Sequence, residues 1–171
     1  MNNEPGLNSG GVPGVIPGAV NRALCWLTGI ACVIAPLILR VGLGLPFYRS
    51  GLTKWNSFLS LNPAIDFLFE EEFKFHLFGQ SYDLPFPDTL AYFTACAEVA
   101  VPILLLFGLA TRFSALFLLC QTAVIQLIVP DGWANFHLPW ATMAIALIAI
   151  GPGRLSIDHG IRGYWERNYS R

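Results

Sequence analysis

Four long stretches of this sequence are almost entirely apolar, and this feature restricts the fold more than any other. They cover about residues 23–47, 89–109, 113–129 and 136–150. A helix that spans a membrane needs about 20 mostly apolar residues. Together the four stretches contain two formal charges, Arg40 in the first and Glu98 in the second. The pattern predicts four transmembrane helices.

The composition supports this prediction and excludes other classes of protein. Hydrophobic residues make up 54% of the chain and charged residues 12%, about half the charged share of roughly 25% in soluble domains. So few charges could not cover the surface of a soluble enzyme domain. The 10 basic and 11 acidic residues nearly balance, whereas a nucleic-acid-binding surface needs clustered excess Lys and Arg. We expect the lipid bilayer as a partner and no nucleic acid.

The connections between the apolar stretches indicate how the helices are arranged. Pro130-Asp131-Gly132 is a turn signal between the third and fourth stretch, and Gly108 to Arg112 forms an equally short join between the second and third. Short joins favour antiparallel neighbours, so residues 22–155 are predicted to form an all-α membrane domain, a four-helix bundle. The distribution of Lys and Arg predicts that both termini lie in the cytoplasm.

The remaining segments are two tails and one long loop. Residues 1–21 are rich in Gly, Pro and Asn and are predicted to be a disordered cytoplasmic tail, and residues 156–171 a second cytoplasmic tail. The outer loop, residues 48–88, is rich in aromatic residues. Its apolar residues alternate, which is typical of a strand, and Gly79-Gln80-Ser81 could turn a small β-hairpin. An interfacial helix over the bundle is the alternative. The alternating residues are Ile65, Phe67, Phe69, Phe73, Phe75 and Leu77.

The two charges inside the apolar stretches are predicted to meet. Arg40 lies 7 residues before the expected outer end of the first helix, about 11 Å deep, and Glu98 lies 9 residues beyond the expected start of the second, about 14 Å deep. An ionisable group within a span normally has a partner or faces a polar cavity. A buried Arg40–Glu98 pair follows, either as a purely structural link between two helices or as part of a site.

Further polar and aromatic residues fall in the same outer half of the predicted bundle. His137 and Trp140 are three residues apart and share a helix face. We predict a ligand pocket open to the outer face, with an aromatic belt and an interfacial histidine as the alternative. The three histidines are far apart in the sequence, so no metal site is predicted. The candidate pocket residues are Gln121, Gln126, Trp133, His137 and Trp140.

Three blocks of residues resemble the DoxX family of small four-helix membrane proteins. The first contains Leu39-Arg40, Gly44, Phe47, Gly51 and Lys54. The second contains Ala97-Glu98, Pro102, Gly108-Leu109 and Thr111-Arg112. The third is the run Gly151-Pro152-Gly153-Arg154-Leu155-Ser156-Ile157-Asp158.

The resemblance implies functions that the residues alone do not. The family is named for a membrane subunit of a thiosulfate:quinone oxidoreductase, and other members are linked to oxidative stress or to iron enzymes that modify metal-binding peptides. It implies a bacterial inner membrane protein, an accessory or membrane subunit of a quinone-linked redox or stress and metal-handling system, with a quinone as ligand and a redox or metal-handling protein as partner. The alternative is a non-enzymatic scaffold or small transporter that docks a partner through its outer loop, where Lys54 and Trp55 are the predicted contacts. A homo-oligomer is compatible with either.

Overall fold

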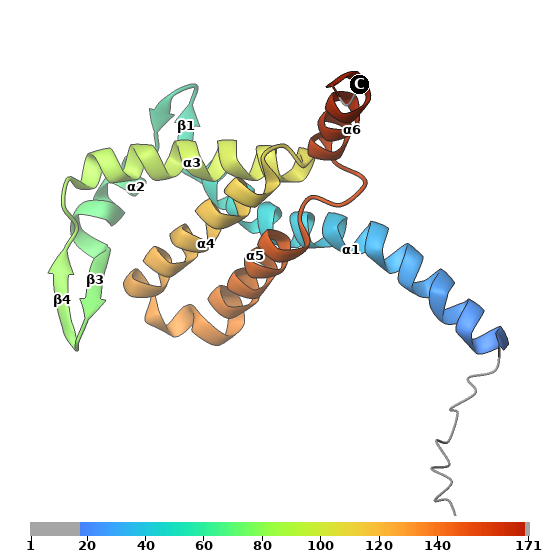
Figure 1. Ribbon diagram of the computed structural model, residues 1–171. Helices are drawn as coiled ribbons and strands as arrows, with labels where there is room; N and C mark the ends of the chain where they lie inside the picture. The colour runs from blue at the N-terminus through green and yellow to red at the C-terminus, as the bar shows by residue number, and fades with distance from the viewer. Residues whose placement is uncertain (1–17, 170–171) are drawn as a thin grey trace, which may run out of the picture. The chain divides into compact units, whose positions relative to one another are not determined.

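The computed structural model describes residues 18–169, and helices make up most of them (Figure 1). The predicted tail at residues 1–21 therefore lies outside the described residues, except that residues 18–21 are helical. The chain divides into two units, Met1–Ala31 and Cys32–Arg171. The first unit contributes the beginning of helix α1, whose apolar side chains are exposed. The sites described below lie in the second unit.

Four segments are long and apolar enough to cross a membrane: α1 (Gly18–Thr53), α3 (Pro87–Phe107), α4 (Thr111–Ile128) and the stretch Pro130–Ile150. The last stretch consists of a short helix η2 (Pro130–Gly132), a π-helical turn η3 (Trp133–His137) and helix α5 (Leu138–Ile150). The predicted all-α membrane fold with four spans is confirmed.

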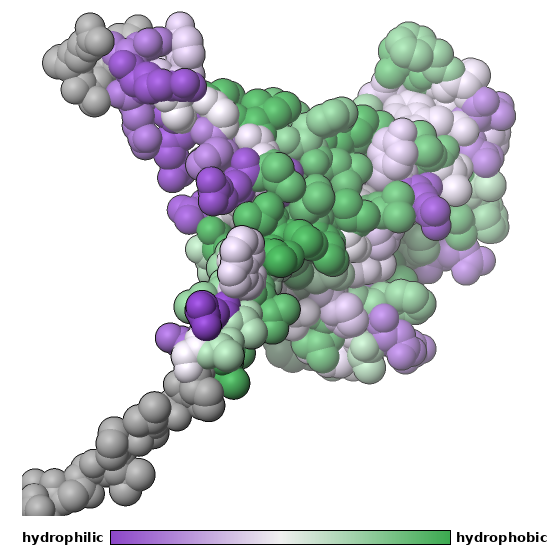
Figure 2. Space-filling model, turned by 90° about the vertical axis from the view of Figure 1, so that its right-hand side faces the viewer, coloured by the Kyte–Doolittle hydropathy of each residue, from purple (hydrophilic) through white to green (hydrophobic). Residues whose placement is uncertain are grey.

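The outer surface of the spans is apolar, as a lipid-facing surface must be. In Figure 2 hydrophobic side chains cover a broad area of the visible face, and hydrophilic side chains gather toward its edges. Many large apolar side chains are exposed, among them Ile38, Phe107, Phe113 and Ile145. In water this surface would be strongly unfavourable, whereas in a bilayer it needs no cover.

The first span ends later than the sequence indicates. Helix α1 continues through Tyr48, Arg49 and Ser50 to Thr53, six residues beyond the predicted end at Phe47. Neither Pro36 nor Pro46 ends the helix, although each lacks the N–H that an interior helical position supplies. The late end decides which side chains of α1 lie beside the second span.

The loop between α1 and α3 contains a hairpin and a short helical segment. A hairpin pairs β3 (Lys74–Leu77) with β4 (Gln80–Asp83), which confirms the predicted hairpin. Its two turn residues are Phe78 and Gly79, with φ of 51° and 79°, as a two-residue hairpin turn of this type requires. The turn was predicted at Gly79-Gln80-Ser81, but Gln80 and Ser81 belong to β4. The alternation at Ile65, Phe67 and Phe69 was a misleading strand signal, because these residues lie in α2 (Pro63–Phe67) and the π-turn η1 (Leu68–Glu72).

A second, smaller hairpin was not expected. It pairs β1 (Trp55–Ser57) with β2 (Ser60–Leu61) and begins two residues after α1 ends. We call the end of the domain that carries these hairpins the loop end. The opposite end carries helix α6 (Ile157–Tyr169), which follows α5 after a short connector, and we call it the α6 end.

Two apolar clusters hold the domain together. The larger one joins side chains of all four spans, including Leu43, Leu105, Leu118 and Leu147. The smaller one, around Phe69, Leu84 and Ala91, attaches the loop to α3. Glycines bring α1 close to its neighbours, as small residues do in membrane helix pairs: a Cβ on Gly51 would lie 2.8 Å from the backbone carbon of Glu98, and one on Gly42 would lie 2.9 Å from the sulfur of Met143.

Candidate functional site

Glu98 lies at the centre of a buried polar cluster at the loop end. Its Oε2 atom pairs with Nζ of Lys54 at 2.5 Å, and its Oε1 atom accepts a hydrogen bond from Nε2 of Gln121 at 3.0 Å. Lys54 Nζ also donates to Oγ of Ser50 at 2.9 Å. Both charged side chains are almost completely buried. A pair of opposite charges in this setting is stable because each charge is hydrogen-bonded and compensated.

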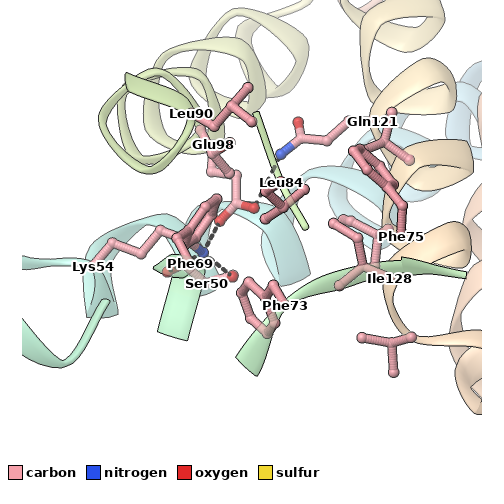
Figure 3. A pocket seen from close by; sticks show the side chains of 14 residues that line it. Ser50, Lys54, Phe69, Phe73, Phe75, Leu84, Leu90, Glu98, Gln121 and Ile128 are labelled. Atoms are coloured by element: carbon pink, nitrogen blue, oxygen red, sulfur yellow. Dashed lines mark hydrogen bonds and ion pairs between the residues drawn. The ribbon is translucent and has the colours of Figure 1, made fainter. Parts of the chain in front are cut away.

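The cluster forms the polar side of a cavity of about 210 Å³. Figure 3 shows the carboxylate of Glu98 between Lys54 and Gln121, with the side chains of the loop and of α3 and α4 around them. The other walls are almost entirely apolar. They are formed chiefly by Phe69, Phe73, Phe75, Leu84, Leu90 and Ile128.

One polar atom of the cluster is unsatisfied. Oε1 of Gln121 is buried and has no hydrogen-bond partner among residues 18–169. Its amide nitrogen is fixed by the bond to Glu98, so turning the amide over would place an oxygen against a carboxylate. A buried acceptor without a donor costs about 1–3 kcal/mol. The cavity wall therefore offers an acceptor that a ligand can use.

Arg40 does not take part in this cluster, and the predicted Arg40–Glu98 pair is wrong. Nε of Arg40 bonds to the carbonyl of Pro36 and Nη1 to that of Leu106, both at 3.3 Å, and Nη2 bonds to the carbonyl of Leu155. The error comes from the end of α1. Because the helix continues to Thr53, Gly51 is level with Glu98, and Arg40 lies 11 residues earlier, about 16 Å along the axis.

Arg40 instead joins the helix ends at the α6 end. Helix α3 ends at Phe107 and is capped by Gly108, whose φ is 69°, and this left-handed cap leaves the carbonyl of Leu106 free for the guanidinium. Asp158 completes the join, since its carboxylate accepts from the backbone N–H of Ala110 and of Thr111 at 2.8 and 2.9 Å. These bonds satisfy N–H groups at the start of α4 that have no partner in the helix.

The predicted outer pocket is divided into two groups of residues. Gln121 belongs to the Glu98 cluster, whereas Gln126, His137 and Trp140 lie together elsewhere at the loop end. Oε1 of Gln126 accepts from Nδ1 of His137 at 2.6 Å, because the amide nitrogen of Gln126 already donates to Pro130. His137 is buried. Of the predicted residues, Trp133 is the most open to the surroundings, with half of its surface exposed.

Trp140 contributes to packing in this second group. Its ring lies 5.0 Å from that of Phe47 and 5.6 Å from the imidazole of His137, measured between centroids. Trp140 packs against the main apolar cluster and is not among the residues that line the cavity. The structure therefore brings His137 and Trp140 together, as their spacing indicated, but apart from the charged cluster.

The two predicted loop contacts have internal partners. Lys54 is buried in the pair with Glu98, and Trp55 packs edge-on against Tyr92 with centroids 5.6 Å apart. The sequence reasoning missed Lys54 as the partner of Glu98, and it missed the phenylalanines of the cavity. One signal was available: Gly51 and Lys54 are three residues apart and share a helix face if α1 is continued.

The four apolar spans and the buried charged cluster define a small membrane protein that crosses the bilayer several times. The model of the DoxX family matches residues 35–131, more than half of the chain, and the chain belongs to this family. An uncharacterized protein of Haemophilus influenzae is 32% identical over 143 residues, which are 78% of this chain and 87% of that protein. No solved structure matches the chain.

Proposed function

We propose that this DoxX-family protein is the membrane subunit of a quinone-linked redox system, and that the head group of the quinone binds in the cavity beside Glu98. The single observation that carries the proposal is the composition of that cavity, in which a charged pair and an amide meet walls of phenylalanine. A quinone head group is a flat apolar ring with two carbonyl oxygens, and it needs both kinds of surface.

The size of the cavity suits one substituted ring. An apolar cavity of about 150 Å³ is known to bind benzene, and this cavity has about 210 Å³. Phe69, Phe73 and Phe75 offer ring faces and edges for stacking. The ammonium of Lys54 is a donor for a quinone carbonyl, and Oε1 of Gln121 is an acceptor for a quinol hydroxyl.

The charged pair also gives the site a group that can exchange protons. Reduction of a quinone to the quinol consumes two electrons and two protons. We assign the two electrons to a redox group of a partner protein and the two protons to water. Glu98 passes each proton in turn from water to a ring oxygen and returns to the carboxylate form after each transfer. A carboxylate within a membrane span is commonly part of such a relay.

Binding of a soluble short-chain quinone analogue tests the proposal. The full-length protein in lipid nanodiscs is titrated by calorimetry, and Phe73→Ala is expected to weaken binding about tenfold, because stacking is worth roughly 0.5–1.5 kcal/mol beyond the buried area. Glu98→Gln is expected to weaken binding and to change its dependence on pH.

Trp140→Ala is the matched control, because it removes an aromatic ring at the loop end that does not line the cavity. It is expected to bind the analogue as the wild type does. The quinone proposal fails if no analogue binds the wild type at tens of micromolar. If Trp140→Ala loses binding and Phe73→Ala keeps it, the site assignment fails.

A scaffold function is the second candidate, and one observation favours it. Phe58, Phe78 and Phe86 lie in loop segments and expose 93%, 103% and 81% of their surfaces. Large exposed aromatic side chains are frequent anchors in protein interfaces. A redox or metal-handling partner that docks there would lose affinity with Phe58→Ser and Phe78→Ser, whereas quinone binding would be unchanged.

The orientation in the membrane belongs to the same proposal. We place both termini in the cytoplasm and the hairpins outside, in a bacterial inner membrane, on the basis of the Lys and Arg distribution. In a variant without native cysteines, a membrane-impermeant thiol reagent should label Ser81→Cys and not Gly160→Cys in intact cells. The opposite pattern would reverse the orientation.

A further inference from the structure

A second cavity, of about 310 Å³, lies at the α6 end and is lined by basic side chains. Arg112 comes from the first turn of α4, Arg154 from the connector after α5, and His159 and Arg162 from α6. The start of α4 and the segment of residues 154–162, which are about 40 residues apart in the sequence, therefore both contribute basic groups to this cavity. Basic residues at the ends of membrane helices are common, but here several of them line one cavity, and such basic pockets are suited to anionic groups.

These basic side chains have no acidic partner in the described part of the chain. No ion pair joins Arg112, Arg154 or Arg162 to a carboxylate within residues 18–169. The adjacent carboxylate, Asp158, is occupied by the N–H groups at the start of α4. Within residues 18–169, no carboxylate therefore forms an ion pair with the arginines of the cavity.

The connector holds one of the arginines at the wall of the cavity. Gly153 has a φ of 75°, and a Cβ at this position would lie 2.7 Å from the ring of Pro36. Only glycine allows this backbone conformation and this close approach without strain. The next residue, Arg154, is thereby held beside α1.

Part of the lining is apolar, and this favours a lipid over a soluble anion. Cys32 and Pro36 of α1 and Ile150, the last residue of α5, belong to the lining, and Ile150 is more than half exposed. A phospholipid has the same distribution, a charged phosphate next to glycerol and acyl chains. Arginine is suited to the charged part because its planar guanidinium binds phosphate oxygens through two parallel hydrogen bonds.

We propose that this cavity binds the phosphate of an anionic phospholipid. Arg154 and Arg162 bind the phosphate oxygens, Arg112 adds a third positive charge, and the apolar residues of the lining receive the start of the acyl chains. The site is separate from the cavity beside Glu98 and does not depend on the function proposed for that cavity.

Native mass spectrometry of the full-length protein in detergent tests the proposal, with phosphatidylglycerol, phosphatidylcholine and inorganic phosphate as probes. The wild type is expected to bind phosphatidylglycerol at least about tenfold more tightly than zwitterionic phosphatidylcholine. The double variant Arg154→Gln/Arg162→Gln is expected to lose this preference. Arg154→Lys/Arg162→Lys keeps the positive charge but lacks the planar guanidinium, and this variant is expected to retain part of the preference for phosphatidylglycerol.

The matched control is the double variant Arg49→Gln/Arg167→Gln. It removes the same charge from two arginines that do not line the cavity, and it is expected to bind both lipids as the wild type does. If both Gln double variants lose the preference for phosphatidylglycerol equally, the preference reflects a general effect of charge, and the proposal is overturned. Unchanged lipid preference in Arg154→Gln/Arg162→Gln would also overturn it. Displacement of phosphatidylglycerol by millimolar inorganic phosphate would assign the site to a soluble anion instead.

Discussion

Lys54 and Arg40 are both buried cations on α1, and their partners are of different kinds. Lys54 is paired with the carboxylate of Glu98, and the pair faces a cavity. Arg40, with 1% of its surface exposed, is surrounded by backbone carbonyls at the ends of other elements. A titratable pair beside a cavity can respond to a ligand or a proton, whereas a guanidinium bonded to carbonyls can only hold the chain together. The comparison separates a candidate site from a structural join within one helix.

Removing the hydrogen bonds between Arg40 and the backbone carbonyls should have the largest effect on stability. Arg40→Met keeps an unbranched apolar side chain at this position but leaves the carbonyls of Leu106 and Leu155 without their donor. Each unsatisfied buried carbonyl costs about 1–3 kcal/mol, so the melting temperature in detergent should fall by about 5 °C or more. Arg49→Met removes an exposed arginine of the same helix and should change it little. Equal melting temperatures for Arg40→Met and the wild type would contradict the assignment.

The pair at the loop end should show coupling. Lys54→Met and Glu98→Gln each leave one buried partner uncompensated, and the double variant leaves none. The double variant should therefore be less destabilised than the sum of the single ones, by about 0.5–3 kcal/mol. Arg40→Met combined with Glu98→Gln should be additive within about 0.5 kcal/mol, since the residues share no partner. Chemical denaturation of the six proteins measures both cycles, and additivity in the first would mean that Lys54 and Glu98 do not pair.

A smaller effect is expected at the helix contact that brings the pair together. Gly51→Ala places a methyl group against the backbone of Glu98, so α1 and α3 must move apart. Overpacking of this kind costs about 1–3 kcal/mol and should also weaken the binding of a ligand in the cavity. Gly29→Ala adds the same methyl group where nothing lies within 4 Å. If the two variants unfold at the same temperature, the close approach at Gly51 is not present.

The smallest effect is expected for the exposed pair on the β3–β4 hairpin. Nζ of Lys74 lies 2.7 Å from Oδ1 of Asp83. The hydrogen bond to Asp83 raises the pKa of Lys74 above its ordinary value of 10.5. Because the folded pKa is the higher one, the stabilisation is complete below pH 10.5 and is lost as the pH rises through the raised pKa. Lys74→Gln should melt slightly below the wild type at pH 8, and the difference should disappear at high pH.

The amino-acid sequence was sufficient for the spans and for one hairpin, but not for the pairing of charges. Apolar length identifies a span because the bilayer imposes it, and the four segments were found in this way. The end of α1 was placed at Phe47 because Tyr48, Arg49 and Ser50 are polar, although such residues also extend a helix beyond the apolar core. Because α1 ends six residues later than predicted, the partner of Glu98 is Lys54 and not Arg40.

The periodicity of the sequence could not predict the cavity, for a different reason. Phe69 lies in a π-helical turn, and Phe73 and Phe75 follow it at the start of a hairpin. Only the contact of this loop with α3 and α4 brings the three rings beside Glu98. Such contacts between distant segments leave no mark in local spacing. His137 and Trp140, in contrast, meet because they are three residues apart where the π-helical turn η3 continues into α5.

The join at Arg40 also has a consequence for the order in which this protein is assembled. Arg40 is in the first span, and one of its three carbonyl partners, Leu155, is 115 residues further along the chain. At a synthesis rate of about 5–20 residues per second, roughly 6–23 s separate the two residues on the ribosome. During that time the first span stays in the bilayer with an arginine whose bonds are incomplete, at a cost of about 2.5–3.5 kcal/mol. A nascent chain stalled before Leu155 should therefore hold its first span loosely and be a preferred substrate for membrane quality-control proteases.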